Sequence, residues 1–260
     1  MATTGYLLRA GQDPGPERRR LQLLERLRDP LTVRRLRWLG VRAGWRCLEV
    51  GAGAGSIVRW LSDAVGPTGQ VLATDVDTRL LDGVVARNVE IRVHDLLADR
   101  WDLAGFDLVH VRAVLHHLPG RQARVIARLI STLRPGGWLL VEEPHVARSA
   151  QLQPGPFGQV RAALADLPQA DYTWAPALPA LVAKSLIKTG TASEVDIGAG
   201  GSDLAEFWRL SLQALHAPLL ATGIVDADLL SAAQAQLTDS TQARVVGAQW
   251  ITVWGCRSAD

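Results

Sequence analysis

The segment of residues 46–61 constrains the fold more than any other part of the chain. It reads as a short apolar strand, a turn with glycine at every second position (Gly51, Gly53 and Gly55) and then a helix. Glycines let a backbone bend sharply and approach a ligand closely, and the first turn of a helix presents unpaired N–H groups. The segment therefore predicts a ligand-binding turn at the edge of a parallel sheet.

From residue 45 onward, short apolar runs alternate with segments of helical periodicity. We expect strands at residues 46–50, 70–74, 89–94, 106–111 and 137–142, and the clearest helix at residues 120–133. That helix should end at residues 134–137, where Arg, Pro, Gly and Gly follow one another and turn the chain. Such alternation predicts an α/β fold with a mostly parallel sheet flanked by helices.

The second half of the chain has a different pattern. Six prolines between Pro144 and Pro179 predict a loop with short helical pieces. We then expect a helix at residues 178–189, a strand at 192–197, a pair of helices across 203–237 and a last strand at 245–254. Helices inserted before the final strand predict a helical lid beside the sheet.

Three carboxylates accompany the glycine turn. Glu49 enters it, Asp75 ends the expected second strand, and Asp95 ends the third. Glu49 would repel a pyrophosphate but suits a cation such as the sulfonium of S-adenosylmethionine. Asp75 can accept hydrogen bonds from ribose hydroxyls, and Asp95 from the adenine amino group. Any single Asp at a strand end could instead be a helix N-cap, but the full series favours a nucleoside-containing cofactor.

At these residues the chain resembles the class I S-adenosylmethionine-dependent methyltransferases, strongly over residues 40–145 and loosely beyond. Residues 49–55, Asp75 and Asp95 are similar to the cofactor-binding motifs of the family, and residues 106–119 and 133–143 resemble its fourth- and fifth-strand motifs. The resemblance implies a Rossmann-like seven-stranded sheet with an antiparallel last strand and S-adenosylmethionine as cofactor. The cofactor-binding residues that it implies are Glu49, Gly51, Ala52, Gly53, Gly55, Asp75, Val76, Asp95, Leu96, Arg112 and Tyr6.

The resemblance also implies how the chain is divided. We expect one methyltransferase domain over residues 1–260: an N-terminal helical cap (1–44), a cofactor-binding core (45–143), and an acceptor-side lid with the last strands (144–260). The stretch between Asp77 and Val89 is short, so the second helix of the family should be abbreviated.

Methyl transfer from a sulfonium is a displacement in which alignment supplies much of the acceleration. A base still helps a phenol, an amine or an acid, and histidine suits that role near neutral pH. His117 is the first candidate and His116 the second, because both follow the fourth strand; Glu143 and His145 are weaker ones. No carboxylate cluster stands there, so we expect no metal. Tyr6 or Trp38 could close over the cofactor.

The acceptor should be a small, partly apolar molecule methylated on oxygen, nitrogen or carbon, in the manner of specialised or natural-product metabolism. Motifs for methylating nucleobase amines, cytosine carbon or protein arginine are absent from the sequence. An apolar pocket wall could come from Phe157, Trp174, Phe207, Trp208 and Leu215. Two alternatives stay open: an RNA or protein methyltransferase that uses a basic N-terminal face, and a non-methylating cofactor-binding protein or rearrangement catalyst.

Composition bears on partners and location. Residues 1–45 hold ten arginines against four acidic residues, but leucines at helical spacing indicate an amphipathic helix, so a nucleic-acid partner is not favoured. No apolar run approaches the ~18 residues of a membrane span and no secretion signal is recognised, so we expect a cytoplasmic protein without a membrane partner. Cys47 and Cys256 should be core residues. A homodimer is one option for assembly.

Overall fold

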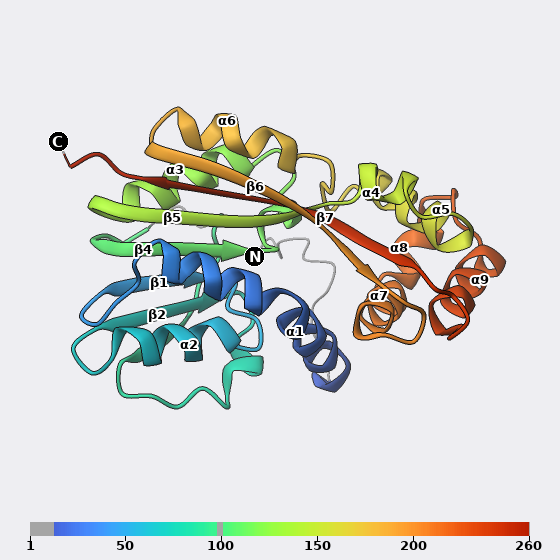
Figure 1. Cartoon of the computed structure of the whole chain (residues 1–260), viewed down its shortest axis with the longest axis horizontal. Coiled ribbons are helices and arrows are strands. Elements are labelled where there is room, and N and C mark those ends of the chain that lie inside the picture. Colours follow the sequence, from blue (N-terminus) through green and yellow to red (C-terminus); the bar gives the residue numbers. More distant parts are fainter. Residues whose placement is uncertain (1–12, 98–100, 260) are drawn as a thin grey trace.

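The computed structural model describes residues 13–97 and 101–259. The strands in these residues form one seven-stranded sheet (Figure 1). Its strand order is β3-β2-β1-β4-β5-β7-β6. β7 runs antiparallel to both neighbours, while β1 to β5 pair in parallel. The predicted α/β class and the antiparallel last strand are confirmed. The strands are β1 (Arg46–Val50), β2 (Gln70–Asp75), β3 (Val89–Val93), β4 (Phe106–Arg112), β5 (Leu133–His145), β6 (Ile187–Gly198) and β7 (Val245–Cys256).

Helices cover both faces of the sheet because both faces of its central strands are apolar. On one face, α1 (Gly15–Trp38) and α2 (Ser56–Val65) pack on a buried cluster that includes Cys47 and Leu108. On the other, α3 (Gln122–Thr132) and α6 (Leu178–Ala183) pack on a cluster that includes Val109 and Val141. Successive strand residues face opposite sides, which explains how adjacent residues belong to different clusters.

A separate group of helices forms the lid (Figure 1). β6 and β7 run past the rest of the sheet to reach it, and a third buried cluster joins the lid to β7 and to the first half of α1. Phe157 and Trp208 are central to that cluster, with ring centroids 5.6 Å apart. The lid helices are α4 (Ala147–Gln151), α5 (Pro156–Ala162), α7 (Asp203–Ala214), α8 (His216–Ala221) and α9 (Ala227–Thr238). Short 3₁₀ turns are η1 (Thr78–Leu81), η2 (Leu115–His117), η3 (Ala163–Asp166) and η4 (Ala175–Ala177).

Several boundaries differ from the sequence-based expectations, four of them as follows. α6 ends at Ala183, and β6 begins at Ile187 within the expected helix, since pairing with β7 extends to Ile187 opposite Cys256. β5 begins at Leu133, because Leu133 pairs with Phe106 ahead of the glycines that we expected to form only a turn. β3 ends at Val93, one residue early.

The abbreviated second helix is confirmed, since η1 has only four residues. Cys47 and Cys256 are both buried, as expected. Within residues 13–97 and 101–259, no helix combines the length and apolarity that a membrane crossing requires.

Candidate active site

A pocket opens at the carboxyl edge of the sheet, between the strand ends, α1 and the lid. One half contains the glycine turn, residues 75–77 and residues 94–96; the other contains the loop after β4 and aromatic side chains of the lid. Of the predicted cofactor-binding residues that the structure describes, all but Gly55 line this pocket. Tyr6 lies outside the described residues.

The turn after β1 needs glycine because other chain segments approach it closely. Gly51 has φ +67°, and a Cβ there would lie 2.2 Å from Cγ2 of Val114, in the loop after β4. No side chain fits, so the two loops can meet beside the pocket. Gly55 has a different role: it precedes α2 with φ +85°, and a Cβ there would lie 2.6 Å from Val84 and 2.9 Å from Leu81. Gly55 therefore permits packing behind the turn instead of the predicted cofactor contact.

Asp75 is held by the turn that it faces. Its Oδ2 accepts a hydrogen bond from the Gly53 N–H (3.0 Å), and its Oδ1 accepts one from the Asp77 N–H (3.0 Å). Burial raises the pKa of Asp75, while these backbone hydrogen bonds oppose the shift. A carboxylate has about four acceptor positions, so Asp75 can hold this geometry and still accept from two ligand hydroxyls.

Asp95 lies on the pocket wall at the end of β3. Its Oδ1 accepts a hydrogen bond from the Leu97 N–H (2.8 Å), which is the local turn expected of an Asp after a strand. The backbone contact and a ligand contact are compatible, because they can use different oxygens.

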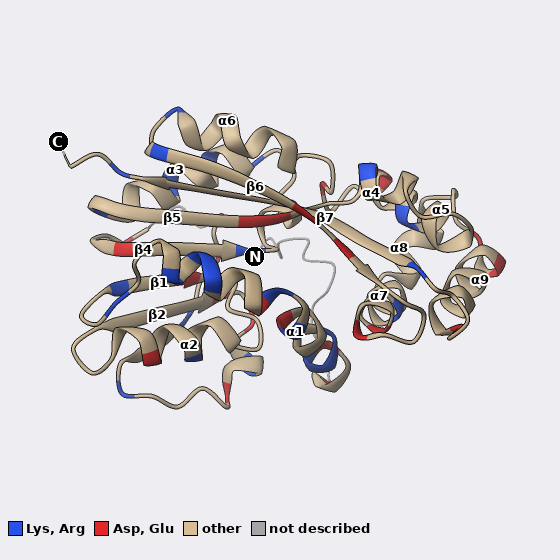
Figure 2. Ribbon diagram, viewed as in Figure 1, with Lys and Arg blue, Asp and Glu red and all other residues tan. Residues whose placement is uncertain are grey.

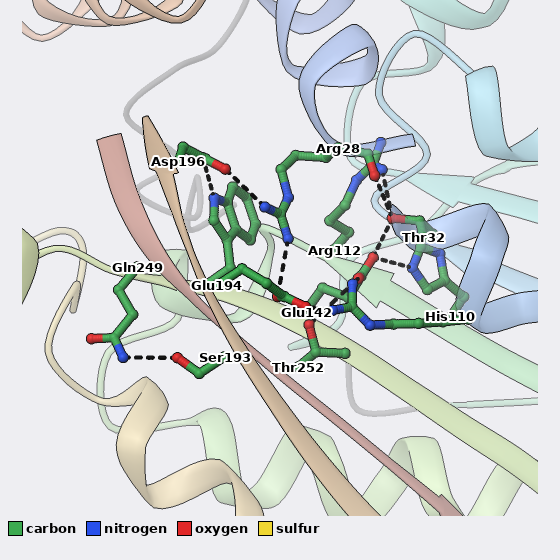
Figure 3. Close-up of polar contacts among 12 residues, drawn as sticks. Arg28, Thr32, His110, Arg112, Glu142, Ser193, Glu194, Asp196, Gln249 and Thr252 are labelled. Atoms are coloured by element: carbon green, nitrogen blue, oxygen red, sulfur yellow. Dashed lines mark hydrogen bonds and ion pairs between the residues drawn. The ribbon is translucent and has the colours of Figure 1, made fainter. Parts of the chain in front are cut away.

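Glu49 belongs to a buried charge network that sequence reasoning missed. Figure 3 shows other members of this network, among them His110 and Glu142. Glu49 Oε2 lies 2.7 Å from His110 Nδ1, and His110 Nε2 lies 3.4 Å from Glu142 Oε2. Burial alone would lower the pKa of His110, but the Glu49 charge and hydrogen bonds to both carboxylates raise it to about 9. Burial favours the neutral form of Glu142, yet the hydrogen bond and charge of His110, with Arg112 and Thr32, lower its pKa to about 2. His110 is therefore an imidazolium between two carboxylates at neutral pH.

Helix α1 covers this network and contributes side chains to it. Arg35 Nη1 binds Glu142 (2.8 Å), Thr32 also donates to Glu142, and Arg28 Nη1 binds Asp196 of β6 (2.9 Å). Figure 2 shows basic residues along α1 and acidic residues on β5 and β6 close to it. Arg28 and Arg35 of this helix thus face carboxylates of the sheet.

Two predicted cofactor contacts have other partners. Arg112 borders the pocket, but its guanidinium binds Asp29 (2.8 Å) and Thr32 (2.9 Å) of α1, so it ties that helix to β4. Trp38 is 67% exposed and packs edge-on against Trp254 at 5.4 Å, outside the pocket. The prediction that Trp38 closes over the cofactor is wrong, because it lies at the opposite end of α1 from the residues that border the pocket.

The residues that do close over the pocket come from the first half of α1. Arg20, Leu21 and Leu24 line it, and the Glu25 carboxylate accepts a hydrogen bond from the Ser56 N–H at the start of α2 (3.1 Å). Burial raises the pKa of Glu25. A regular helical pattern identified α1 as amphipathic but could not show which of its residues reach a ligand.

The acceptor half combines apolar walls with a polar end. Phe207, Trp208 and Leu215 line it as predicted, while Phe157 lies in the lid core and Trp174 in the sheet core. The polar end contains His116, His117 and Tyr172, with the two imidazole centroids 3.9 Å apart and the His116 and Tyr172 centroids 4.8 Å apart.

The two candidate histidines differ in their surroundings. His116 Nδ1 lies 2.9 Å from Glu143 Oε2. Burial, followed by the neighbouring His116 and Arg20, lowers the pKa of His117 well below its ordinary value. Glu143 is fully buried, and neither Glu143 nor His145 borders the pocket. Neither is therefore placed to contact an acceptor bound there.

The pocket has the form expected for a methyl donor beside an acceptor, and the sequence comparisons agree. Residues 48–139 match the model of a methyltransferase domain family. This part of the chain is a class I methyltransferase domain. Domains of this class use S-adenosylmethionine as the methyl donor, as the sequence predicts.

Individual relatives and solved structures extend this finding. The ubiquinone/menaquinone biosynthesis C-methyltransferase UbiE of Pseudomonas putida is 35% identical over 112 residues, which are 40% of this chain and 43% of that protein. The chain thus spans less than half the length of the curated relatives it matches.

The fold extends beyond that match. The phosphoethanolamine N-methyltransferase 2 of Haemonchus contortus covers 92% of this chain and 52% of its own, with TM-score 0.54 and 16% identity. The [4+2]-cyclase SpnF covers 89% of this chain and 81% of its own, with TM-score 0.50 and 18% identity. These two likenesses show that almost the whole chain, lid included, adopts one fold, but that fold carries more than one chemistry.

Proposed function

We propose that the chain transfers a methyl group from S-adenosylmethionine to a small, partly apolar acceptor. The observation that carries the proposal is a single pocket in which the glycine turn, Asp75 and Asp95 meet an aromatic acceptor half. The enzyme would act on oxygen, nitrogen or carbon. The C-methyltransferase name of the Pseudomonas relatives favours carbon, and a role in specialised metabolism stays a hypothesis.

The residues fit the cofactor. Gly53 borders the pocket, Asp75 is held where it would accept ribose hydroxyls, and the Glu49 carboxylate, paired with His110, borders the pocket near the turn. Bound S-adenosylmethionine supplies an activated methyl group on a sulfonium. The chain's own residues would orient that group towards the aromatic half, exclude water beneath α1 and remove the acceptor proton.

The charges of α1 argue against the RNA or protein alternative. Arg20, Arg28 and Arg35 are buried in ion pairs with carboxylates, Arg26 binds Asp203 of α7, and Arg18 donates to the Leu80 carbonyl. Five of the ten arginines in residues 1–45 are therefore engaged within the fold. A small acceptor needs no basic surface.

Calorimetry with S-adenosylhomocysteine, the demethylated product, tests the cofactor site. Asp75→Ala should weaken binding about tenfold or more, since hydrogen bonds to a charged acceptor contribute about 1.5–3 kcal/mol each. Asp63→Ala, a change on the exposed side of α2, is the matched control and should bind like the parent. Equal affinities for all three proteins would remove Asp75 from the site.

A second candidate function, rearrangement without methyl transfer, is raised by the likeness to the [4+2]-cyclase. Mass spectrometry of small molecules that co-purify with the chain would identify an acceptor to assay. Formation of S-adenosylhomocysteine in step with acceptor conversion supports methyl transfer; conversion with the cofactor intact would favour rearrangement.

A further inference from the structure

Several hydrogen bonds fix the polar groups of the acceptor half, and most of them converge on Glu143. Glu143 Oε1 accepts hydrogen bonds from the N–H groups of Val114 (2.9 Å) and Leu115 (2.8 Å), and its Oε2 accepts one from that of His116 (3.1 Å). The same Oε2 binds the His116 ring. One buried carboxylate therefore sets both the path of the loop after β4 and the orientation of one imidazole.

A second segment fixes the loop from the opposite side. The Asp171 N–H donates to the His116 carbonyl (2.7 Å), which brings the Tyr172 ring against the His116 ring. His116 is only 4% exposed, yet it borders the pocket. Its ring is thus held on the Glu143 and Tyr172 sides and presented to the acceptor half.

This arrangement assigns the protons on His116. A carboxylate is an acceptor only, so Nδ1 must carry the hydrogen, and Nε2 of the neutral ring then carries the lone pair. Glu143 would stabilise the positive charge that the ring gains when Nε2 takes a proton. Burial and the neighbouring His116 and Arg20 lower the pKa of His117, which favours its neutral form.

The remaining charges at this end favour an acceptor that becomes an anion. Arg20 of α1 is 5% exposed, borders the pocket and is held by Glu17 at 2.8 and 2.6 Å. Its charge lowers the pKa of His117 and opposes the burial that raises the pKa of Tyr172 to about 12. Glu17 offsets part of this charge, but the Arg20 guanidinium still favours a developing oxyanion over a cationic amine there.

We propose that the acceptor is a phenol or enol on an apolar ring, that His116 removes its hydroxyl proton, and that Glu143 is the positioning residue for His116. The O–H bond breaks as the proton moves to Nε2. The oxyanion, or the ring carbon that it activates, forms a bond to the methyl carbon, and the electron pair of the breaking carbon–sulfur bond stays on sulfur. After attack through carbon, the ring carbon loses its own proton. This inference rests on the proposed function.

The test uses nitrophenols as probes, because their phenolates absorb visible light. 4-Nitrophenol and the larger 4-nitro-1-naphthol are titrated spectroscopically with the full chain saturated with S-adenosylhomocysteine. In the parent protein the bound probe should ionise at a lower pH than the free probe. The other ionisable groups at this end include His117, Tyr172, Arg20 and its partner Glu17, and all four are kept in the variants.

Glu143→Gln replaces one carboxylate oxygen by an NH2 group. The remaining oxygen can still accept from the N–H groups of Val114 and Leu115. This variant should lower the ratio of phenolate to phenol at fixed pH about tenfold or more, the effect of one charge-assisted hydrogen bond. His116→Asn should lower it at least as much, and it decides the question if Glu143→Gln does not fold. Glu90→Gln, at an exposed ion pair on β3, is the matched control and should behave like the parent.

A purely structural role for Glu143 would change the melting temperature but not the ionisation of the probe. Unchanged ionisation in both site variants would overturn the roles of His116 and Glu143. If S-adenosylhomocysteine binds but neither probe does, the phenol or enol class is wrong while the proposed function stands. If S-adenosylhomocysteine itself does not bind, the proposed function fails.

Discussion

Glu142 and Glu143 are adjacent in β5, each binds a histidine, and the two pairs serve different regions of the molecule. Glu142 points to the face covered by α1, where it meets His110, Thr32 and Arg35. Glu143 points to the opposite face and meets the loop after β4 and His116. The alternation of a strand separates the two clusters by one residue.

The two pairs differ in what their imidazoles can reach. His110 is fully buried and has a carboxylate at each ring nitrogen, so neither nitrogen can exchange a proton with a ligand. His116 has one carboxylate contact and borders the pocket. The comparison teaches that a buried pair of glutamate and histidine is structural or chemical according to whether the second ring nitrogen meets protein or ligand.

The largest expected effect is on stability, and it tests the Glu142 side. Glu142→Gln removes the buried carboxylate that His110 and Arg35 share and leaves Glu49 and Glu194 as their remaining acidic partners. Breaking a buried pair costs up to about 3–5 kcal/mol of unfolding free energy. Urea denaturation measures this loss. Glu90→Gln, at an exposed pair, should cost less than about 1 kcal/mol. If the two variants unfold alike, the α1 network does not hold the fold together.

The next effect is the pH dependence of the same network. The folded-state pKa of His110 is raised from 6.5 to about 9, so its contribution to stability is complete below pH 6.5 and is lost as the pH rises through 9. The loss is on the order of 3 kcal/mol at most. Denaturation at pH 6.5 and pH 9.5 should reveal it, and His110→Gln should flatten the difference. An equally steep profile in that variant would assign the proton to another group.

The smallest effect sharpens the comparison on the pocket side. His117→Ala should slow methyl transfer to a phenol by less than about tenfold, the scale of a neutral hydrogen bond, because the proposed base is His116, which Glu143 orients. His116→Ala should slow it by about 10²–10⁴-fold, the range for a general base. Steady-state rates with both variants measure the difference. The reverse order would return the base to His117, the first candidate of the sequence analysis.

Most of the cofactor-binding residues that local patterns predicted line the pocket, with Gly55 as an exception. Glycine spacing, Glu49, Asp75 and Asp95 lie in sequence next to the strand ends that position them, so the order of residues translates directly into geometry. The alternation of strands and helices predicted the sheet, and the family resemblance its antiparallel last strand. Boundaries were less accurate where tertiary pairing decided them, as at Ile187.

Long-range contacts were beyond such patterns. His110 and Glu142 are 32 residues apart, and nothing local marks them as partners until the register of β4 and β5 is known. Gly55 fitted the same glycine spacing as Gly51, yet close packing against Val84 and Leu81 gives it a structural role. Two adjacent histidines likewise looked equivalent in sequence, and only Glu143, 27 residues beyond His116, distinguishes them.

The position of α1 has a consequence for how the chain is made. Its arginines bind carboxylates that are translated much later: Asp196 is 168 residues after Arg28, and Asp203 is 177 residues after Arg26. This helix, which is synthesised before β6 and α7, therefore gains these two charged partners only when those elements have been made. Closing so long a loop is slow compared with forming local helices, so α1 should dock in the final steps of folding. The pocket, which α1 closes, becomes complete only then.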